Sequence, residues 1–259
     1  MAQIGFDRRR INGPEESFPP IFEDEDATPT AKGAYERPRP PSDIRPIFLQ
    51  PHLINQAAGS CYIETEKTKL ACAVYGPRQS KNVAYSERGK LNVEVKYTPY
   101  ACRRRKAPMR DAEDRSLSIA IQQALAPAIR LELFPKSIID VFVIVIEADG
   151  IEGCVASGSV AASTALADAG IEMIGLVLSC SASVLAGEIW LDPTEEDAKA
   201  ADGTVVLSCI PALGTVTNIW QSGKMSIEEL VKCTTECQER CSDVHSVVAQ
   251  ALRDNETGQ

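Results

Sequence analysis

Apolar and polar residues alternate along the chain that follows residue 44, which is the pattern of β-strands with one buried face. Residues 60–66 and 69–75 alternate in this way on either side of a polar tripeptide, so we expect a hairpin across Glu66, Lys67 and Thr68. Residues 76–89 then predict a polar loop, and residues 90–97 alternate again as a further half-buried strand.

Later segments are more continuously apolar. They predict buried strands at residues 138–146, 174–185 and 204–211, with a further strand that ends near residues 190–193. Helical spacing appears in residues 110–131, where the apolar positions fall four apart at Leu117, Ile121, Leu125 and Ile129. Two more helices are predicted at residues 155–169 and 225–254. The resulting order of elements, βββαβαβββα, indicates an α+β fold.

Residues 1–44 lack this regularity. Seven prolines and the acidic run at residues 23–26 argue against a packed unit. Apolar residues such as Phe6 and Phe18 are nevertheless more frequent than in a plain linker, so the segment is expected to be either disordered or an extended arm laid on a neighbour. We expect one folded domain at residues 45–254, followed by a short tail at 255–259.

The overall charge is strongly acidic. The 259 residues include 27 Lys and Arg against 36 Asp and Glu, which gives a net charge of −9. Attraction of the whole chain to nucleic acid is therefore excluded, although a local basic patch is not. No apolar run is long enough to predict a membrane span, and the start of the chain lacks the apolar core of a secretory signal.

The nine cysteines are scattered and odd in number, as expected of reduced thiols that act as small apolar residues. Cys233, Cys237, Cys241 and His245 are spaced by four, so they share one stripe of a helix. Cys233 and Cys241 would stand about 12 Å apart along its axis, too far to share one zinc ion. The stripe therefore predicts packing against a sheet, and no metal site is expected.

A glycine-rich turn at residues 149–153 lies between the strand at 141–146 and a helix of small residues. A strand that enters such a turn and opens a helix forms an anion cradle, because free N–H groups and the helix dipole converge there. This turn contains no Lys or Arg, however, and Glu152 would repel phosphate. The backbone of a phosphate site is thus predicted without its cation.

The turn and helix resemble those of the RNase PH family of phosphorolytic exoribonucleases, in which the turn is roughly D-G-G-T-R and the helix ends A-L-A-D-A-G. Asp149, Gly150 and residues 165–170 match, whereas the arginine that grips phosphate in the family falls on Gly153. Residues 59–78 are similar to the family's opening hairpin and its G-P-R turn. The resemblance covers about residues 45–241 and implies an RNase PH-like fold, a single domain related to ribosomal protein S5 domain 2.

Residues 9–17 and the degenerate turn narrow the resemblance to the mRNA-transport-type ring subunit of the eukaryotic RNA exosome. This implies a subunit without catalysis or cofactor that supports processing and degradation of RNA, rRNA and mRNA included. Its partners would be other RNase PH-like ring subunits, RNA-binding cap subunits and single-stranded RNA, without a membrane. It would act in the nucleus, nucleolus and cytoplasm. The alternative is an active phosphate-dependent 3′–5′ exoribonuclease. A third interpretation has a neighbouring subunit supply the missing cation.

Two basic clusters are candidates for RNA contact. The denser one precedes the helix at 110–131 and consists of Arg103, Arg104, Arg105, Lys106 and Arg110. Such runs suit phosphate contacts, but a subunit interface or a solvated loop is also possible. In the second cluster the resemblance implies a loop at the pore of the ring, where Arg78, Lys81 and Arg88 would line an RNA path. An ordinary hairpin loop is the competing interpretation.

Acidic residues follow the strand that ends near 190–193. Active members of the family place paired acids here to hold Mg²⁺, and hard oxygen ligands suit that ion. Asp202 matches the second acidic position, and Glu196 or Asp197 matches the first. Without a cation to grip inorganic phosphate these acids do not suffice, and we favour a surface acidic loop.

Overall fold

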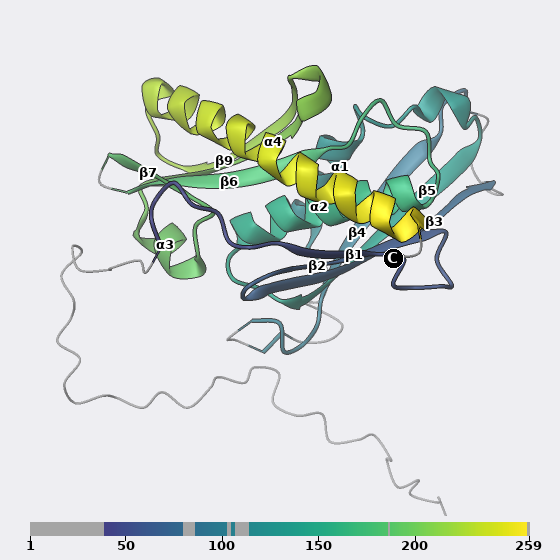
Figure 1. Ribbon diagram of the computed structural model, residues 1–259, viewed down its shortest axis with the longest axis horizontal. Coiled ribbons are helices and arrows are strands. Elements are labelled where there is room, and N and C mark those ends of the chain that lie inside the picture. Colours follow the sequence, from purple (N-terminus) through teal and green to yellow (C-terminus); the bar gives the residue numbers. More distant parts are fainter. Residues whose placement is uncertain (1–38, 80–85, 103–104, 107–113, 186, 258–259) are drawn as a thin grey trace, which may run out of the picture.

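The computed structural model describes residues 39–79, 86–102, 105–106, 114–185 and 187–257. Two β-sheets and the helices between and above them make up this part of the chain (Figure 1). The Lys81, Arg103, Arg104 and Arg110 positions predicted to contact RNA lie outside the described residues.

The first sheet has five strands in the order β1-β2-β3-β5-β4. Its members are β1 (Phe48–Pro51), β2 (Gly59–Thr65), β3 (Thr68–Gln79), β5 (Ser137–Glu147) and β4 (Lys90–Tyr97). All neighbours are antiparallel except β4 and β5, which are parallel and connected through helix α1 (Arg115–Leu125). Inward-facing residues alternate along β2 and β4, and this alternation is what the sequence pattern detected.

The second sheet has four antiparallel strands in the order β7-β6-β8-β9. They are β7 (Glu188–Leu191), β6 (Leu178–Leu185), β8 (Gly203–Ile210) and β9 (Thr215–Gly223). Every residue of β8 is buried, whereas most of β9 is exposed at the edge of the sheet. Short 3₁₀ turns at Leu131–Leu133 and Pro211–Leu213 and helix α3 (Glu195–Ala200) complete the connections.

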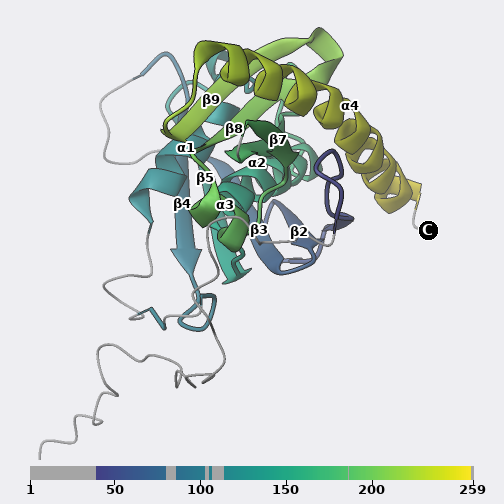
Figure 2. The same cartoon turned by 90° about the vertical axis from the view of Figure 1, so that its left-hand side faces the viewer.

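Helix α2 (Ile151–Asp168) lies between the two sheets and packs on β2 and β3 on one side and on β6 and β8 on the other. Small residues allow this close approach: a Cβ added to Gly158 would stand 2.9 Å from Cδ1 of Ile121. Helix α1 packs beside α2, and α4 (Ile227–Thr257) crosses the outer face of the second sheet (Figures 1 and 2). The start of α2 is thereby fixed between two sheets.

The expected α+β order and several elements are confirmed. The hairpin turns at Glu66 and Lys67, with Glu66 at a φ of 52°. The helix predicted at 155–169 starts earlier, at Ile151, because the glycine turn itself forms its first cap. The helix predicted at 110–131 ends at Leu125, since Pro127 cannot continue it.

Other strand boundaries differ from the prediction. Strand β3 continues through residues 76–79, into the expected loop, because it still pairs with β5 there. Strand β6 begins at Leu178, four residues later than expected. The sequence did not indicate α3 or β9, whose Thr, Asn, Gln and Ser residues lack the alternation of a half-buried strand.

The cysteine stripe packs as predicted. Cys233, Cys237 and Cys241 are fully buried where α4 covers β6 and β8. All nine cysteines are free thiols. Among the described residues, no three His, Cys, Asp or Glu side chains are placed to hold a metal ion. The helices in this part of the chain are all too short or too polar to span a bilayer.

Candidate phosphate site

The glycine-rich turn connects β5 to α2. Gly150 is the residue that caps α2, and its φ of 93° is a conformation that favours glycine. No side chain caps this helix terminus. The first residues of α2 therefore line a cleft, as the anion-cradle pattern in the sequence predicts.

Arg45 is the central side chain of the site, and only 2% of it is exposed. Its Nη1 donates to Oδ2 of Asp149 at 2.8 Å. Its Nε and Nη2 donate to the two carboxylate oxygens of Asp192 at 2.7 and 2.6 Å. The backbone N–H of Arg45 also donates to Asp192, at 2.9 Å. One buried guanidinium thus joins the phosphate turn to the loop after β7.

Both partners of this pair remain charged. Burial alone would lower the pKa of Arg45, but hydrogen bonds and charge from Asp192, together with the charge of Asp149, raise it. Burial alone would raise the pKa of Asp192, but the hydrogen bonds and charge of Arg45 lower it. Arg39 adds to the cluster, because its Nη2 donates to the Asp192 carbonyl at 2.7 Å.

Gly153 faces this buried cation. A Cβ added to Gly153 would lie 3.4 Å from Nη2 of Arg45 and 3.5 Å from Oγ1 of Thr68. This is the position onto which the resemblance places the phosphate-gripping arginine. The only guanidinium beside it, within the described residues, is directed at two aspartates instead.

Glu152 is held inside the fold. It is 9% exposed, and its Oε1 accepts a hydrogen bond from Oγ1 of Thr204 on β8 at 2.9 Å. A carboxylate in the first turn of a helix is also favoured by the helix dipole. Glu152 thus places negative charge where a phosphate would bind.

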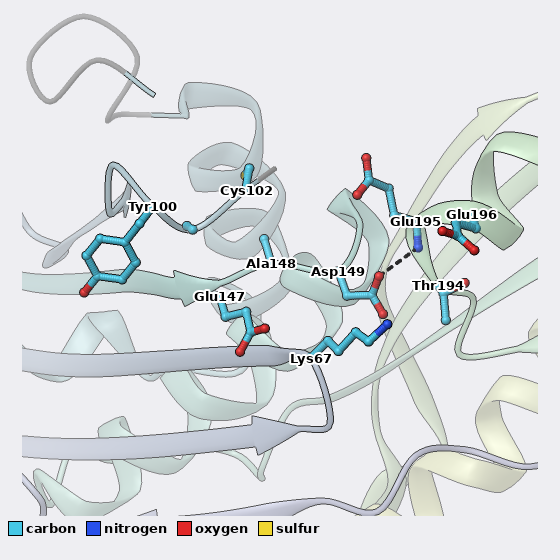
Figure 3. A pocket seen from close by; sticks show the side chains of 10 residues that line it. Lys67, Tyr100, Cys102, Glu147, Ala148, Asp149, Thr194, Glu195 and Glu196 are labelled. Atoms are coloured by element: carbon cyan, nitrogen blue, oxygen red, sulfur yellow. Dashed lines mark hydrogen bonds between the residues drawn. The ribbon is translucent and has the colours of Figure 1, made fainter. Parts of the chain in front are cut away.

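Two adjoining clefts of about 340 and 390 Å³ open beside the turn and share Cys102, Ala148 and Glu195. Figure 3 shows the first, where Lys67 extends from the β2–β3 turn toward Asp149. The cations that line the two clefts are Lys67, Lys106 and Lys199. The carboxylates that line them are Asp114, Glu147, Asp149, Glu152, Glu195 and Glu196. The clefts therefore repel anions overall.

Two of the lysines have partners that reduce their availability. Lys199 Nζ donates to Glu195 at 2.6 Å. Lys106 Nζ lies 3.4 Å from the centre of the Tyr97 ring, a cation–π contact. Unlike Arg45, these groups are at the surface of the cleft and can rearrange.

Comparison with known proteins follows this geometry closely. The family model described as "3' exoribonuclease family, domain 1", the RNase PH model, matches residues 43–172, half of the chain. The chain belongs to the RNase PH family. The match includes both ends of the Arg45–Asp149 ion pair and the degenerate turn.

Curated relatives cover nearly the whole chain. "Exosome complex component mtr3" of Schizosaccharomyces pombe is 38% identical, over 95% of this chain and 95% of its own. "Exosome complex component MTR3" of Homo sapiens is 37% identical, over 95% and 94%. "Exosome complex component Rrp41" of Pyrococcus furiosus is 36% identical, over 82% and 85%.

Solved structures agree on the fold. Rice Rrp46 matches with a TM-score of 0.69 at 21% identity, covering 84% of this chain and 98% of its own. An archaeal exosome core chain matches with a TM-score of 0.67 at 15% identity, covering 82% and 89%. The single-domain RNase PH-like fold expected from the sequence is confirmed.

In this RNase PH family member the acidic positions do not converge. Asp197 is 1% exposed and forms the capping box of α3: its Oδ2 accepts from the Thr194 N–H at 2.9 Å, and its own N–H donates to Thr194 Oγ1 at 3.2 Å. Glu196 is exposed and lines the first cleft, and Asp202 is exposed just before β8. Asp197 thus has a structural role that the sequence did not reveal.

The basic positions lie at the surface, as far as the described residues include them. Arg78 forms an ion pair with Asp140 and lies over the Tyr75 ring, 5.9 Å from its centre. Arg88 is 3.3 Å from Glu132, and both side chains are about three-quarters exposed. Arg105 is exposed, and its neighbour Lys106 lines the second cleft. Their role in RNA contact stays a prediction.

The buried ion-pair cluster was not predicted. Arg45 stands alone between apolar residues in Ile44, Arg45, Pro46 and Ile47. A single arginine at the start of an apolar segment is the available sequence signal for a buried, paired guanidinium. Its partners are 104 and 147 residues away, and only the fold brings them together.

Proposed function

We propose that this chain is a non-catalytic ring subunit of an RNA exosome, of the mRNA-transport type. It would pack with other RNase PH-like ring subunits and with RNA-binding cap subunits, and guide single-stranded RNA toward a nuclease elsewhere. Family membership and relatives named as exosome components support this assignment. We place its work in the nucleus, nucleolus and cytoplasm, in RNA processing and decay.

The observation that carries the proposal is the charge of the degenerate site. Phosphorolysis needs inorganic phosphate held as the nucleophile, and Gly153 offers no cation for it. Arg45 is committed to Asp149 and Asp192, and the clefts contain twice as many carboxylates as lysines. Removing one preorganised electrostatic interaction costs about 10²–10³ in rate, and here the sign of the whole site is reversed.

An active phosphate-dependent 3′–5′ exoribonuclease is the alternative. The exposed carboxylates Glu196 and Asp202 favour it, since both are accessible to a cation contributed by a neighbouring subunit. Lys67, which points toward Asp149 in Figure 3, would supply one positive charge. The buried capping role of Asp197 weakens this alternative, because it removes one of the two residues that match the first acidic position.

We propose RNA capture by the basic segment Arg103, Arg104, Arg105, Lys106 and Arg110, with Arg78, Lys81 and Arg88 as a second contact. The described part of the segment borders the second cleft through Lys106. Phosphate contacts release counterions, so binding should fall steeply with salt. They carry no base information, so binding should be similar across sequences.

The test replaces Arg103, Arg104 and Arg105 with Ala in the assembled particle. RNA affinity should weaken, and its log–log salt slope should flatten by about 0.7 for each phosphate that the variant no longer neutralises. The matched control removes three exposed cations elsewhere, Arg130, Lys136 and Lys232, and should leave the slope unchanged. Failure of the ring to assemble, with an unchanged slope in any intact particle, would instead assign the segment to a subunit interface.

A further inference from the structure

The described parts of the two sheets leave four edge strands: β1, β4, β7 and β9. Three of them carry the usual protection against unwanted pairing. Strands β1 and β7 have four residues each, and β1 ends in Pro51. Strand β4 has three charged residues, Lys90, Glu94 and Lys96. Short length, proline and charge all discourage a second chain from pairing at an edge.

Strand β9 has none of these protections. Its nine residues, TVTNIWQSG, contain no charge and no proline. It pairs with β8 along its whole length and ends the second sheet (Figure 2). No other described strand lies beside it, and within the described ranges no backbone bond from a loop reaches its open side. An open row of N–H and C=O groups therefore runs along the edge.

Apolar side chains follow this edge on one side. Helix α4 runs back along β9, since Gln238 Nε2 donates to the carbonyl of Gly214, just before the strand begins. The exposed apolar residues on this path are Leu213 (55%), Val216 (45%), Ile219 (46%), Ile227 (80%) and Val231 (58%). They are five of the fourteen large apolar side chains that the described residues expose, so they form a concentrated strip.

The opposite face of β9 is already occupied. Asn218 Nδ2 donates to the carbonyl of Ala120 on α1, and Trp220 packs against the core. The strand is therefore anchored in the fold and its edge is preformed. A second chain would pay little ordering cost on this side.

We propose that β9 and the apolar strip bind an extended, uncharged strand of a neighbouring subunit by β-strand addition. The open backbone supplies the hydrogen-bond ladder, and Val216 and Ile219 select apolar side chains on the incoming strand. RNA does not fit this surface, because β9 has no cation and α4 begins with Glu228 and Glu229. That the neighbour is an RNase PH-like subunit rests on the proposed function.

The experiment reconstitutes the full chain with RNase PH-like ring subunits and measures amide exchange at Thr215–Gly223. These amides should exchange at least about tenfold more slowly in the particle, because hydrogen-bonded edge amides are protected. Ile219→Lys should weaken assembly at least about tenfold, which corresponds to about 1.4 kcal/mol. Val247→Lys, on α4 and also 44% exposed, is the matched control and should assemble as the wild type does.

The outcomes separate the two proposals. Unchanged β9 exchange in an assembled particle, or normal assembly of a folded Ile219→Lys variant, would overturn the docking strand and leave the ring assignment intact. Failure of the wild-type chain to assemble would contradict the ring assignment itself. Protection of β9 in a homodimer of this chain, without other subunits, would overturn the proposed occupant. Ile219→Thr provides a milder change if the lysine variant does not fold.

Discussion

The guanidinium of Arg45 lies 3.4 Å from the point at which a Cβ on Gly153 would stand. In this RNase PH family member the place of the missing arginine is thus next to a cation that is already buried and paired. The site did not simply lose a side chain. Its remaining positive charge is directed inward, to Asp149 and Asp192.

Restoring an arginine at Gly153 should therefore not restore phosphorolysis. Gly153→Arg would place a second guanidinium beside Arg45 without removing the surrounding carboxylates, and like charges at this distance repel. We expect no phosphate-dependent release of nucleoside diphosphates and a lower Tm. The assay is single-stranded RNA with and without inorganic phosphate, followed by separation of the products. Appearance of nucleoside diphosphates in the variant would show that only the side chain was missing.

Gly153→Ala is the control for backbone effects. A Cβ at this position meets neighbours at ordinary contact distances of 3.4 and 3.5 Å. Alanine in a helix interior is favoured over glycine by about 1 kcal/mol, so the Tm should stay level or rise by about 2–4 °C. A marked fall would mean that the site tolerates no side chain at all.

Removing Arg45 should destabilise the fold strongly. Arg45→Met leaves Asp149 and Asp192 without their buried partner, and breaking such a pair costs about 3–5 kcal/mol. Arg45→Lys should cost less than Arg45→Met but not behave as wild type, because lysine lacks the fork that binds both Asp192 oxygens. Denaturant unfolding measures both. Arg88→Met is the control: its exposed pair with Glu132 should contribute less than about 1 kcal/mol.

Stability should depend on pH through Asp192. Its pKa in the fold is lowered below its ordinary value of 3.8, so its ion pair stabilises the protein above about pH 4. This contribution is lost as the pH falls through the folded-state pKa. The Tm of the wild type should drop between pH 6 and pH 2 by more than that of Asp192→Asn, which lacks the titrating group. Equal pH profiles would contradict an ionised Asp192 in the fold.

Thiol reactivity should report on the cleft. Burial raises the pKa of Cys154 and of Cys61 to about 12, so both should resist alkylation in the native state. Cys102 is only half-buried and lines both clefts, and although burial raises its pKa, the charge of Lys106 opposes that shift. Iodoacetamide at pH 8 should therefore modify Cys102 first, as measured by peptide mass spectrometry. Early modification of Cys154 would mean that the start of α2 opens.

Local pattern accounted for much of the fold. The hairpin across Glu66, the buried strands and the cysteine stripe of α4 all follow from periodicity within short segments, and each is confirmed. Boundaries were less predictable where one residue overrides a longer pattern, as Pro127 does at the end of α1.

The missed features depend on contacts between distant segments. Strand β9 is defined by its pairing with β8 and by its place at an edge, and its polar composition does not indicate a strand. The role of Arg45 depends on Asp149 and Asp192, which the fold alone brings within hydrogen-bond distance. The turn at Gly153 was visible as a defect, but the buried cation beside it was not.

The central claim is that this chain does not catalyse phosphorolysis. It is tested most directly by incubating the purified chain, alone and in the assembled ring, with single-stranded RNA and inorganic phosphate. We predict no phosphate-dependent release of nucleoside diphosphates by the chain, and no change in the ring's activity with the Asp202→Asn substitution. Phosphate-dependent release of nucleoside diphosphates that Asp202→Asn abolishes would contradict the account.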